Sequence, residues 1–199
     1  MAAEVPELLV QNAEQWREWL TENHASRPGV WLVLHKKGGT VTEITHASAL
    51  DEALCFGWID GQAKRRDAES VFQRWTPRGP KSSWSVRNTE HIARLEAEGK
   101  MAQAGWAAVE AAKADGRWEM AYATQSDSEL PADLLEAISA NHRAQKMLDV
   151  LNTKNRFAMY FRLSQLKTEA GRQRKIAGFV EMLARYEAPY PQRDKPAGE

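Results

Sequence analysis

The sequence predicts an α+β fold, with a small antiparallel sheet and helices in its N-terminal half and an all-helical C-terminal region. Two observations predict the sheet: a short apolar run at residues 30–34, and two segments of alternating character at 58–66 and 70–76. A third predicts the helical region. Beyond residue 131 the apolar residues recur three, four and seven positions apart, which is the spacing of one helix face.

The first two elements follow from a cap and a short apolar run. Asn12 with Gln15 forms a capping-box pattern, which predicts a helix over residues 13–24. The run at 30–34 is bounded by Pro-Gly on one side and Gly-Gly on the other. Such a run is too short for a helix of three turns, so we expect a buried strand.

A second helix and a pair of strands come next. Thr45 is placed to cap the helix, and Gly57 is placed to end it in the left-handed conformation. The segments 58–66 and 70–76 then read as an antiparallel pair joined near residues 67–69. In the second segment the side chains alternate, with Val71, Gln73 and Trp75 on one face and Phe72, Arg74 and Thr76 on the other.

The next stretch holds two more helices. Prolines and glycines at 77–80 forbid regular structure until Ser85 or Asn88 caps a helix that stops at Gly99. Residues 101–114 are rich in alanine and form the following helix. Together these elements define an expected α+β domain over residues 1–122.

The rest of the chain divides into a linker, a helical region and a tail. Residues 123–130 are polar and lack periodicity, so we expect a linker there. Residues 131–188 form the helical region, whose last helix has the most regular apolar stripe: Ile176, Phe179, Val180, Leu183 and Tyr186. Residues 189–199 are expected to be a disordered tail.

Composition excludes several classes of protein. With 27 basic and 27 acidic residues the net charge is zero, so the whole chain has no electrostatic attraction to nucleic acid or anionic membranes. The charge is uneven, however, because residues 62–88 hold seven Lys or Arg against two Asp or Glu. No apolar stretch approaches the roughly 18 residues of a membrane span, so we expect no membrane insertion. Cys55 is the single cysteine and the N-terminus lacks a secretory pattern, which together predict a cytoplasmic protein.

The basic central segment is the candidate ligand site. Its tryptophans lie among cations, and an arginine fork beside an indole face suits an anion attached to a flat group. The ligand would be an anionic small molecule or an anionic group of a partner, while nucleic acid is disfavoured. The residues proposed to bind it are Trp58, Asp60, Arg65, Arg74, Trp75, Arg78, Lys81 and Trp84. The alternative is that the tryptophans are core anchors and the cations their solvated neighbours.

Signatures of catalysis and metal binding are weak. None of the five histidines has another histidine four residues away, and none has a cysteine companion, so we expect no metal and no cofactor. Cys55 stands between apolar residues, which favours a core position over a nucleophile. No catalytic residue is assigned.

Three strings resemble the YdeI/OmpD-associated family, also called the bacteriocin-protection family. They are EALCFGWIDG at 52–61, FQRWTPR at 72–78 with KSSWS at 81–85, and a basic stretch, Arg172, Arg174 and Lys175, followed by FVEML at 179–183. The resemblance extends from Leu8 to Arg185. It implies a small bacterial cytosolic protein with an α+β N-terminal half and a helical C-terminal region. The family is associated with tolerance of antimicrobial peptides or envelope stress. It implies no catalytic residue or cofactor.

We therefore expect a binding protein of a stress or antimicrobial-peptide-resistance response, with an anion-recognising Trp/Arg pocket. One alternative is an enzyme acting on a phosphorylated or carboxylated small molecule, with Asp60 as general base and Arg78 and Lys81 stabilising charge. Another is a nucleic-acid-binding protein, which requires the central cations and the basic residues at 154–175 to form one continuous face.

Overall fold

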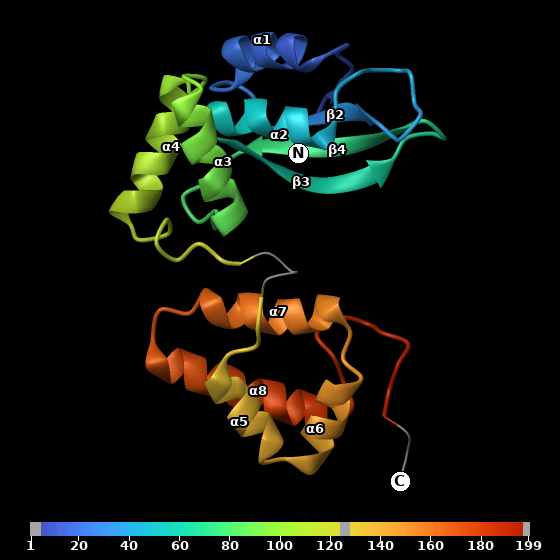
Figure 1. Ribbon diagram of the computed structural model, residues 1–199, viewed down its shortest axis with the longest axis vertical. Helices are drawn as coiled ribbons and strands as arrows, with labels where there is room; N and C mark the ends of the chain where they lie inside the picture. Colours follow the sequence, from blue (N-terminus) through green and yellow to red (C-terminus); the bar gives the residue numbers. More distant parts are fainter. Residues whose placement is uncertain (1–4, 124–127, 197–199) are drawn as a thin grey trace. The chain divides into compact units, whose positions relative to one another are not determined.

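The structure is a computed structural model that describes residues 5–123 and 128–196 (Figure 1). It contains two compact units, Met1–Ala121 (unit 1) and Tyr122–Glu199 (unit 2). Unit 1 is α+β and unit 2 is helical, so the predicted fold class is confirmed. No helix in the described part of the chain is long and apolar enough to cross a membrane.

Unit 1 contains a four-stranded sheet in the order β1-β2-β4-β3. Its strands are β1 (Glu7–Leu8), β2 (Val30–His35), β3 (Trp58–Arg65) and β4 (Ser70–Pro77). The three longer strands are antiparallel as expected, whereas β1 runs parallel to β2. The sheet is therefore mixed. Sequence reasoning missed β1 because two residues are too few to show an alternating pattern.

Four helices complete unit 1: α1 (Ala13–Asn23), α2 (His46–Cys55), α3 (Val86–Ala97) and α4 (Gln103–Ala114). Figure 1 shows α1 and α2 lying along the sheet, with α3 and α4 near one end of it. The predicted caps of the first three helices are confirmed, since the side chains of Asn12, Thr45 and Ser85 each accept a backbone N–H bond.

The core of unit 1 is built on tryptophans. All eight tryptophans of the chain lie in this unit. Trp16 of α1 lies 6.4 Å from Trp58 and 6.2 Å from Trp75, measured between ring centres, and Trp19 stacks on it at 5.2 Å. The apolar residues of β2 that face this cluster are Val30, Leu32 and Leu34. The core therefore lies between the helices and one face of the sheet.

Unit 2 consists of α5 (Ala132–Ser139), α6 (His142–Asp149), α7 (Thr153–Ser164) and α8 (Glu169–Ala184). The stripe predicted for the last helix is buried at three of its positions, Ile176, Phe179 and Leu183. From α7 the residues that enter the core are Met159 and Leu163. The aromatic residues of that helix, Phe157, Tyr160 and Phe161, instead form a half-buried cluster with Tyr122.

The C-terminal segment, expected to be a disordered tail, is attached to α7. Asn155 is fully buried, and its side chain accepts the backbone N–H of Tyr190 at 2.8 Å and donates to the side-chain oxygen of Gln192 at 2.9 Å. Gln192 in turn donates to the carbonyl oxygen of Val150 at 3.1 Å. These bonds place residues 190–192 beside α7. Residues 197–199 of the tail and 124–127 of the expected linker lie outside the described residues.

Candidate functional site

The three tryptophans of the expected site are core residues. Trp58 and Trp84 are each 1% exposed, and Trp75 is fully buried. The indole N–H of Trp58 donates to the carbonyl oxygen of His24 at 3.2 Å, while Trp84 lies 5.0 Å from Trp118 between ring centres. No indole face is left open for a ligand at these positions, which favours the alternative reading of the tryptophans as core anchors.

Arg78 holds the loop before α3 onto that core. Its guanidinium carbon lies 3.6 Å from the ring centre of Trp84, and its Nη1 donates to the carbonyl oxygen of Ser83 at 3.0 Å. Arg117 donates to the neighbouring carbonyl of Ser82 at 3.0 Å. Lys81 is exposed in the same loop. The geometry gives Arg78 a structural task, in which one planar cation covers a buried indole.

Asp60 and Arg65 lie apart from this loop on β3. Asp60 is one-third exposed, and its Oδ2 lies 3.2 Å from Nε2 of His46. It precedes an irregularity in the pairing of β3 with β4, so Asp60-Gly61 marks a bulge inside a strand. Arg65 is exposed near the end of β3. The enzyme alternative needs Asp60 inside a closed pocket, and its partly exposed position gives that alternative no support.

A different set of residues comes together on the face of the sheet opposite the core. We call it the cation–aromatic face, and it consists of Trp31, Lys64, Arg66, Phe72 and Arg74. In the strand register, Arg74 is paired with Trp31, and Phe72 is paired with Lys64 on its other side. Paired residues of neighbouring strands point to the same face, so these side chains project together away from the core.

Three cations of this face lie against two aromatic rings. The ammonium of Lys64 is 4.4 Å from the ring centre of Trp31 and 4.7 Å from that of Phe72. Arg66 lies 5.8 Å from Phe72, and Arg74 lies 6.0 Å from Trp31. These distances are within the range of cation–π attraction, which holds positive charge over the rings.

The three cations differ in their acidic partners. Lys64 lies 3.4 Å from a carboxylate oxygen of Glu7, and Arg66 lies 2.7 Å from one of Asp67. Both pairs are largely exposed and therefore weak. Arg74 has no ion pair with any described residue, and its Nε is buried without a described acceptor. Of the three cations, Arg74 is therefore the one whose charge no described carboxylate offsets.

An open pocket adjoins this face at the edge of the sheet. It has a volume of about 590 Å³ and is lined by Val5, Pro6, Glu7, Trp31 and Lys64. This volume is within the range of small-molecule sites. One flank of Trp31 is thus accessible beside a cation, which none of the buried indoles offers.

Sequence reasoning identified Arg74 but missed its neighbours on this face. The run at 30–34 is a buried strand as predicted, but Trp31 is only half-buried within it. The signal was present in the alternation of β4, which already placed Phe72 and Arg74 on the face opposite Trp75. Extending that alternation across β2 would have added Trp31.

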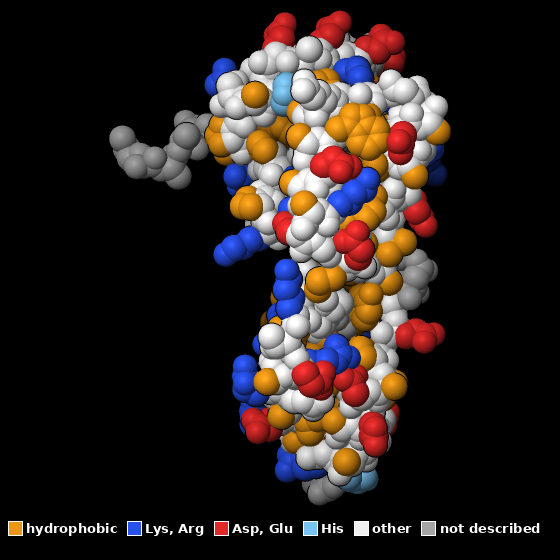
Figure 2. Space-filling view, turned by 90° about the vertical axis from the view of Figure 1, so that its left-hand side faces the viewer, with side chains coloured by type: hydrophobic (Ala, Val, Ile, Leu, Met, Phe, Trp, Pro, Cys, Tyr) orange, Lys and Arg blue, Asp and Glu red, His pale blue; other side chains and the backbone are white. Residues whose placement is uncertain are grey.

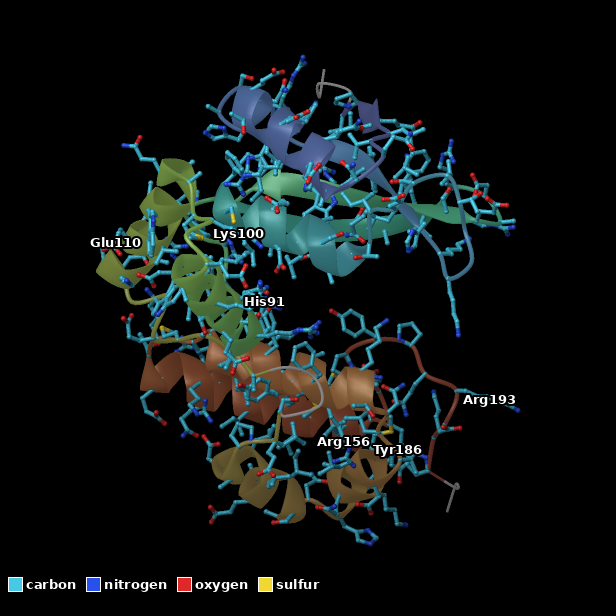
Figure 3. All side chains as sticks on the ribbon, turned by 45° about the horizontal axis from the view of Figure 1, so that its top comes forward. His91, Lys100, Glu110, Arg156, Tyr186 and Arg193 are labelled. Carbon is cyan, nitrogen blue, oxygen red and sulfur yellow. The ribbon has the colours of Figure 1, made fainter. Side chains whose placement is uncertain are left out.

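Asp51, His91 and Arg94 form a small ion-pair cluster between α2 and α3. Asp51 of α2 lies 3.3 Å from His91 and 2.6 Å from Arg94, both on α3, where Figure 3 shows His91. No group of three His, Cys, Asp or Glu able to hold a metal occurs among the described residues. Burial raises the pKa of the Cys55 thiol above its usual value, because the thiolate is costly to desolvate. The thiol therefore behaves as a core group.

Comparison with known proteins divides the chain much as the structure does. The family described as "Domain of unknown function (DUF8412)" matches residues 8–108, just over half of the chain. The family described as "Bacteriocin-protection, YdeI or OmpD-Associated" matches residues 127–186. That match is shorter than the resemblance expected from 8 to 185, and it leaves the two central strings within the DUF8412 match. No curated protein and no solved structure matches the chain. The chain belongs to the DUF8412 family, and its C-terminal unit carries a domain of the YdeI/OmpD-associated, bacteriocin-protection family.

Proposed function

We propose that unit 1 is a non-catalytic binding module whose cation–aromatic face takes an anionic group attached to a flat group. The observation that carries this proposal is the position of Lys64, whose ammonium lies within 5 Å of the ring centres of both Trp31 and Phe72. A flat group would stack on the accessible flank of Trp31, and its anion would meet Lys64 and Arg74.

The proposed anion site differs from the expected one, although it uses cations of the same central segment. Arg74 is kept from the expected set, while Trp58, Trp75 and Trp84 become the core beneath the sheet. Glu7 and Asp67 share the neighbourhood of the cations, and their charge opposes a polyanion more than a single anionic group. A small anionic molecule, or one anionic group of a partner, is therefore favoured over nucleic acid.

The family of unit 2 gives the biological setting. A YdeI/OmpD-associated domain is consistent with a role related to stress or bacteriocin protection. We propose that the protein acts in the cytoplasm of a bacterium, where its single buried thiol needs no disulfide partner. In this account unit 1 supplies ligand recognition within that response.

Adenosine monophosphate, which joins a flat base to a phosphate, is a suitable probe. Tryptophan fluorescence, excited where adenine does not absorb, should change saturably on titration, and added salt should weaken binding. Lys64→Gln and Arg74→Gln should each weaken binding by about tenfold, since tenfold corresponds to the ~1.4 kcal/mol expected of one charge-assisted bond.

Lys113→Gln is the matched control. Lys113 also lies over an indole, 5.8 Å from the ring centre of Trp118, and pairs at 3.0 Å with Glu110. Figure 3 labels Glu110 on α4. Its removal changes the net charge equally but leaves the cation–aromatic face intact, so binding should stay within about twofold. If all three substitutions weaken binding to the same degree, general charge rather than this face attracts the ligand, and the proposal fails.

A further inference from the structure

A second candidate site lies in unit 2, in a groove between α7 and α8. The groove has a volume of about 490 Å³, within the range of small-molecule sites. We call it the α7–α8 groove, and it is lined by Arg162, Leu166, Gly171, Arg174, Lys175, Gly178, Phe179 and Met182.

The lining follows from helical periodicity. Gly171, Arg174, Gly178 and Met182 are three or four residues apart along α8, so they share one face of that helix. Arg162 of α7 lies four residues before Leu166, which follows the helix. The groove is therefore a stripe of α8 that α7 and the following turn flank but do not cover.

The cations of the groove lack acidic partners, although the guanidinium carbon of Arg162 lies 5.5 Å from the ring centre of Tyr190. Arg162, Arg174 and Lys175 form no ion pair with any residue that the structure describes. Other cations of the same basic region do have partners. Arg172 forms a two-bond ion pair with Asp133 at 2.6 and 2.8 Å, which holds the pKa of that carboxyl below its usual value.

A second basic residue outside the groove is also structural. Arg156, labelled in Figure 3, donates to the carbonyl oxygens of Leu148 and Leu151 at 2.6 and 3.0 Å. In the space-filling view, Lys and Arg side chains gather along one edge of unit 2 (Figure 2). The groove is lined by three cations and by no Asp or Glu, so it carries a local excess of positive charge.

The rest of the lining is apolar or open. Leu166 and Met182 are half-buried, and Phe179 is 4% exposed. A Cβ atom added at Gly178 would meet no atom within 4 Å, so the groove is unobstructed at that point. A free inorganic anion would contact only the cations, whereas an apolar chain attached to the anion would also cover these side chains.

We propose that the α7–α8 groove binds an amphiphile that carries a single phosphate group. The phosphate contacts Arg162, Arg174 and Lys175 through charge-assisted hydrogen bonds. The apolar chain lies past Gly178 on Leu166, Phe179 and Met182. The three cations are too few and too local for a nucleic-acid strand, which needs a continuous basic track.

Isothermal titration calorimetry of the full chain with monomeric dodecyl phosphate tests this proposal. We expect saturable binding with one site in unit 2, and binding of inorganic phosphate at least about tenfold weaker because the apolar contacts are lost. Unit 2 contains no tryptophan, so binding in the groove should leave tryptophan fluorescence unchanged. This readout separates the groove from the site proposed in unit 1.

Gly178→Glu and Ala177→Glu are a matched pair of variants. Both place one negative charge on an exposed position of α8, but only Gly178 lines the groove. Glutamate is a better helix former than glycine, so Gly178→Glu should fold. Gly178→Glu should weaken dodecyl phosphate binding by about tenfold or more, and Ala177→Glu by less than about threefold. Equal effects of the two variants, no effect of Gly178→Glu, or equally tight binding of inorganic phosphate would each overturn the proposal.

Discussion

Replacing Trp75 with alanine should lower the free energy of unfolding of unit 1 by about 3–5 kcal/mol, the usual cost of emptying a buried aromatic position. The ring is fully buried and lies 6.2 Å from Trp16 and 5.7 Å from His46, measured between ring centres. Its indole N–H has no acceptor among the described residues, so the loss should come from packing alone. Denaturant unfolding followed by circular dichroism would measure it.

Trp31→Ala is the control for that experiment. The same residue type is removed from the same sheet, but Trp31 is half-buried on the opposite face. We expect a loss of no more than about 1–2 kcal/mol, together with loss of ligand binding. If Trp75→Ala lowered the free energy of unfolding no more than Trp31→Ala, the division of the sheet into a core face and the cation–aromatic face would be wrong.

Gly105→Ala should be the most damaging small substitution in unit 1, at about 3 kcal/mol or more, because the added methyl overpacks a backbone contact. A Cβ at Gly105 would lie 2.2 Å from the carbonyl oxygen of Cys55, at the end of α2. That carbonyl also accepts the N–H of Ala102 at 3.1 Å, which ties the start of α4 to α2. Neither helix can move away without breaking this bond.

Gly178→Ala makes the same chemical change but should raise the free energy of unfolding instead of lowering it. Gly178 is also inside a helix, and a methyl there meets no atom within 4 Å. The substitution should stabilise unit 2 by about 0.5–1 kcal/mol through the unfolded chain. Thermal unfolding of both variants would compare them. A neutral Gly105→Ala would show that α2 and α4 do not approach so closely.

The parts of the fold that the sequence predicted are those set by neighbouring residues. The caps at Asn12, Thr45 and Ser85 depend on hydrogen bonds to residues three positions away, so a local pattern is enough to find them. β1 and the attachment of the C-terminal segment depend on distant partners. Asn155 forms hydrogen bonds with Tyr190 and Gln192, which are 35 and 37 positions later, and no local spacing predicts that contact.

The residues of the expected site divide between the two faces of the sheet for a geometric reason. Arg74 and Trp75 are adjacent in sequence, and interleaving of cations with indoles suggested that they act together. On a strand, adjacent side chains point to opposite faces, so Trp75 enters the core while Arg74 meets Trp31 on the other side. Because they are adjacent on a strand, Arg74 and Trp75 cannot contact the same ligand on one face of the sheet. The partner came from β2, about 40 residues earlier in the chain.

The most direct test of the central claim is an NMR titration that follows the eight indole N–H signals, each assigned by a Trp→Phe variant. With adenosine monophosphate as ligand, the signal of Trp31 should shift saturably, and Arg74→Gln should weaken that response. The signals of Trp58, Trp75 and Trp84 should stay in place because those rings are buried. A saturable shift confined to Trp84 or Trp75, with the signal of Trp31 unchanged, would contradict the account. It would place the ligand beside the buried tryptophans instead.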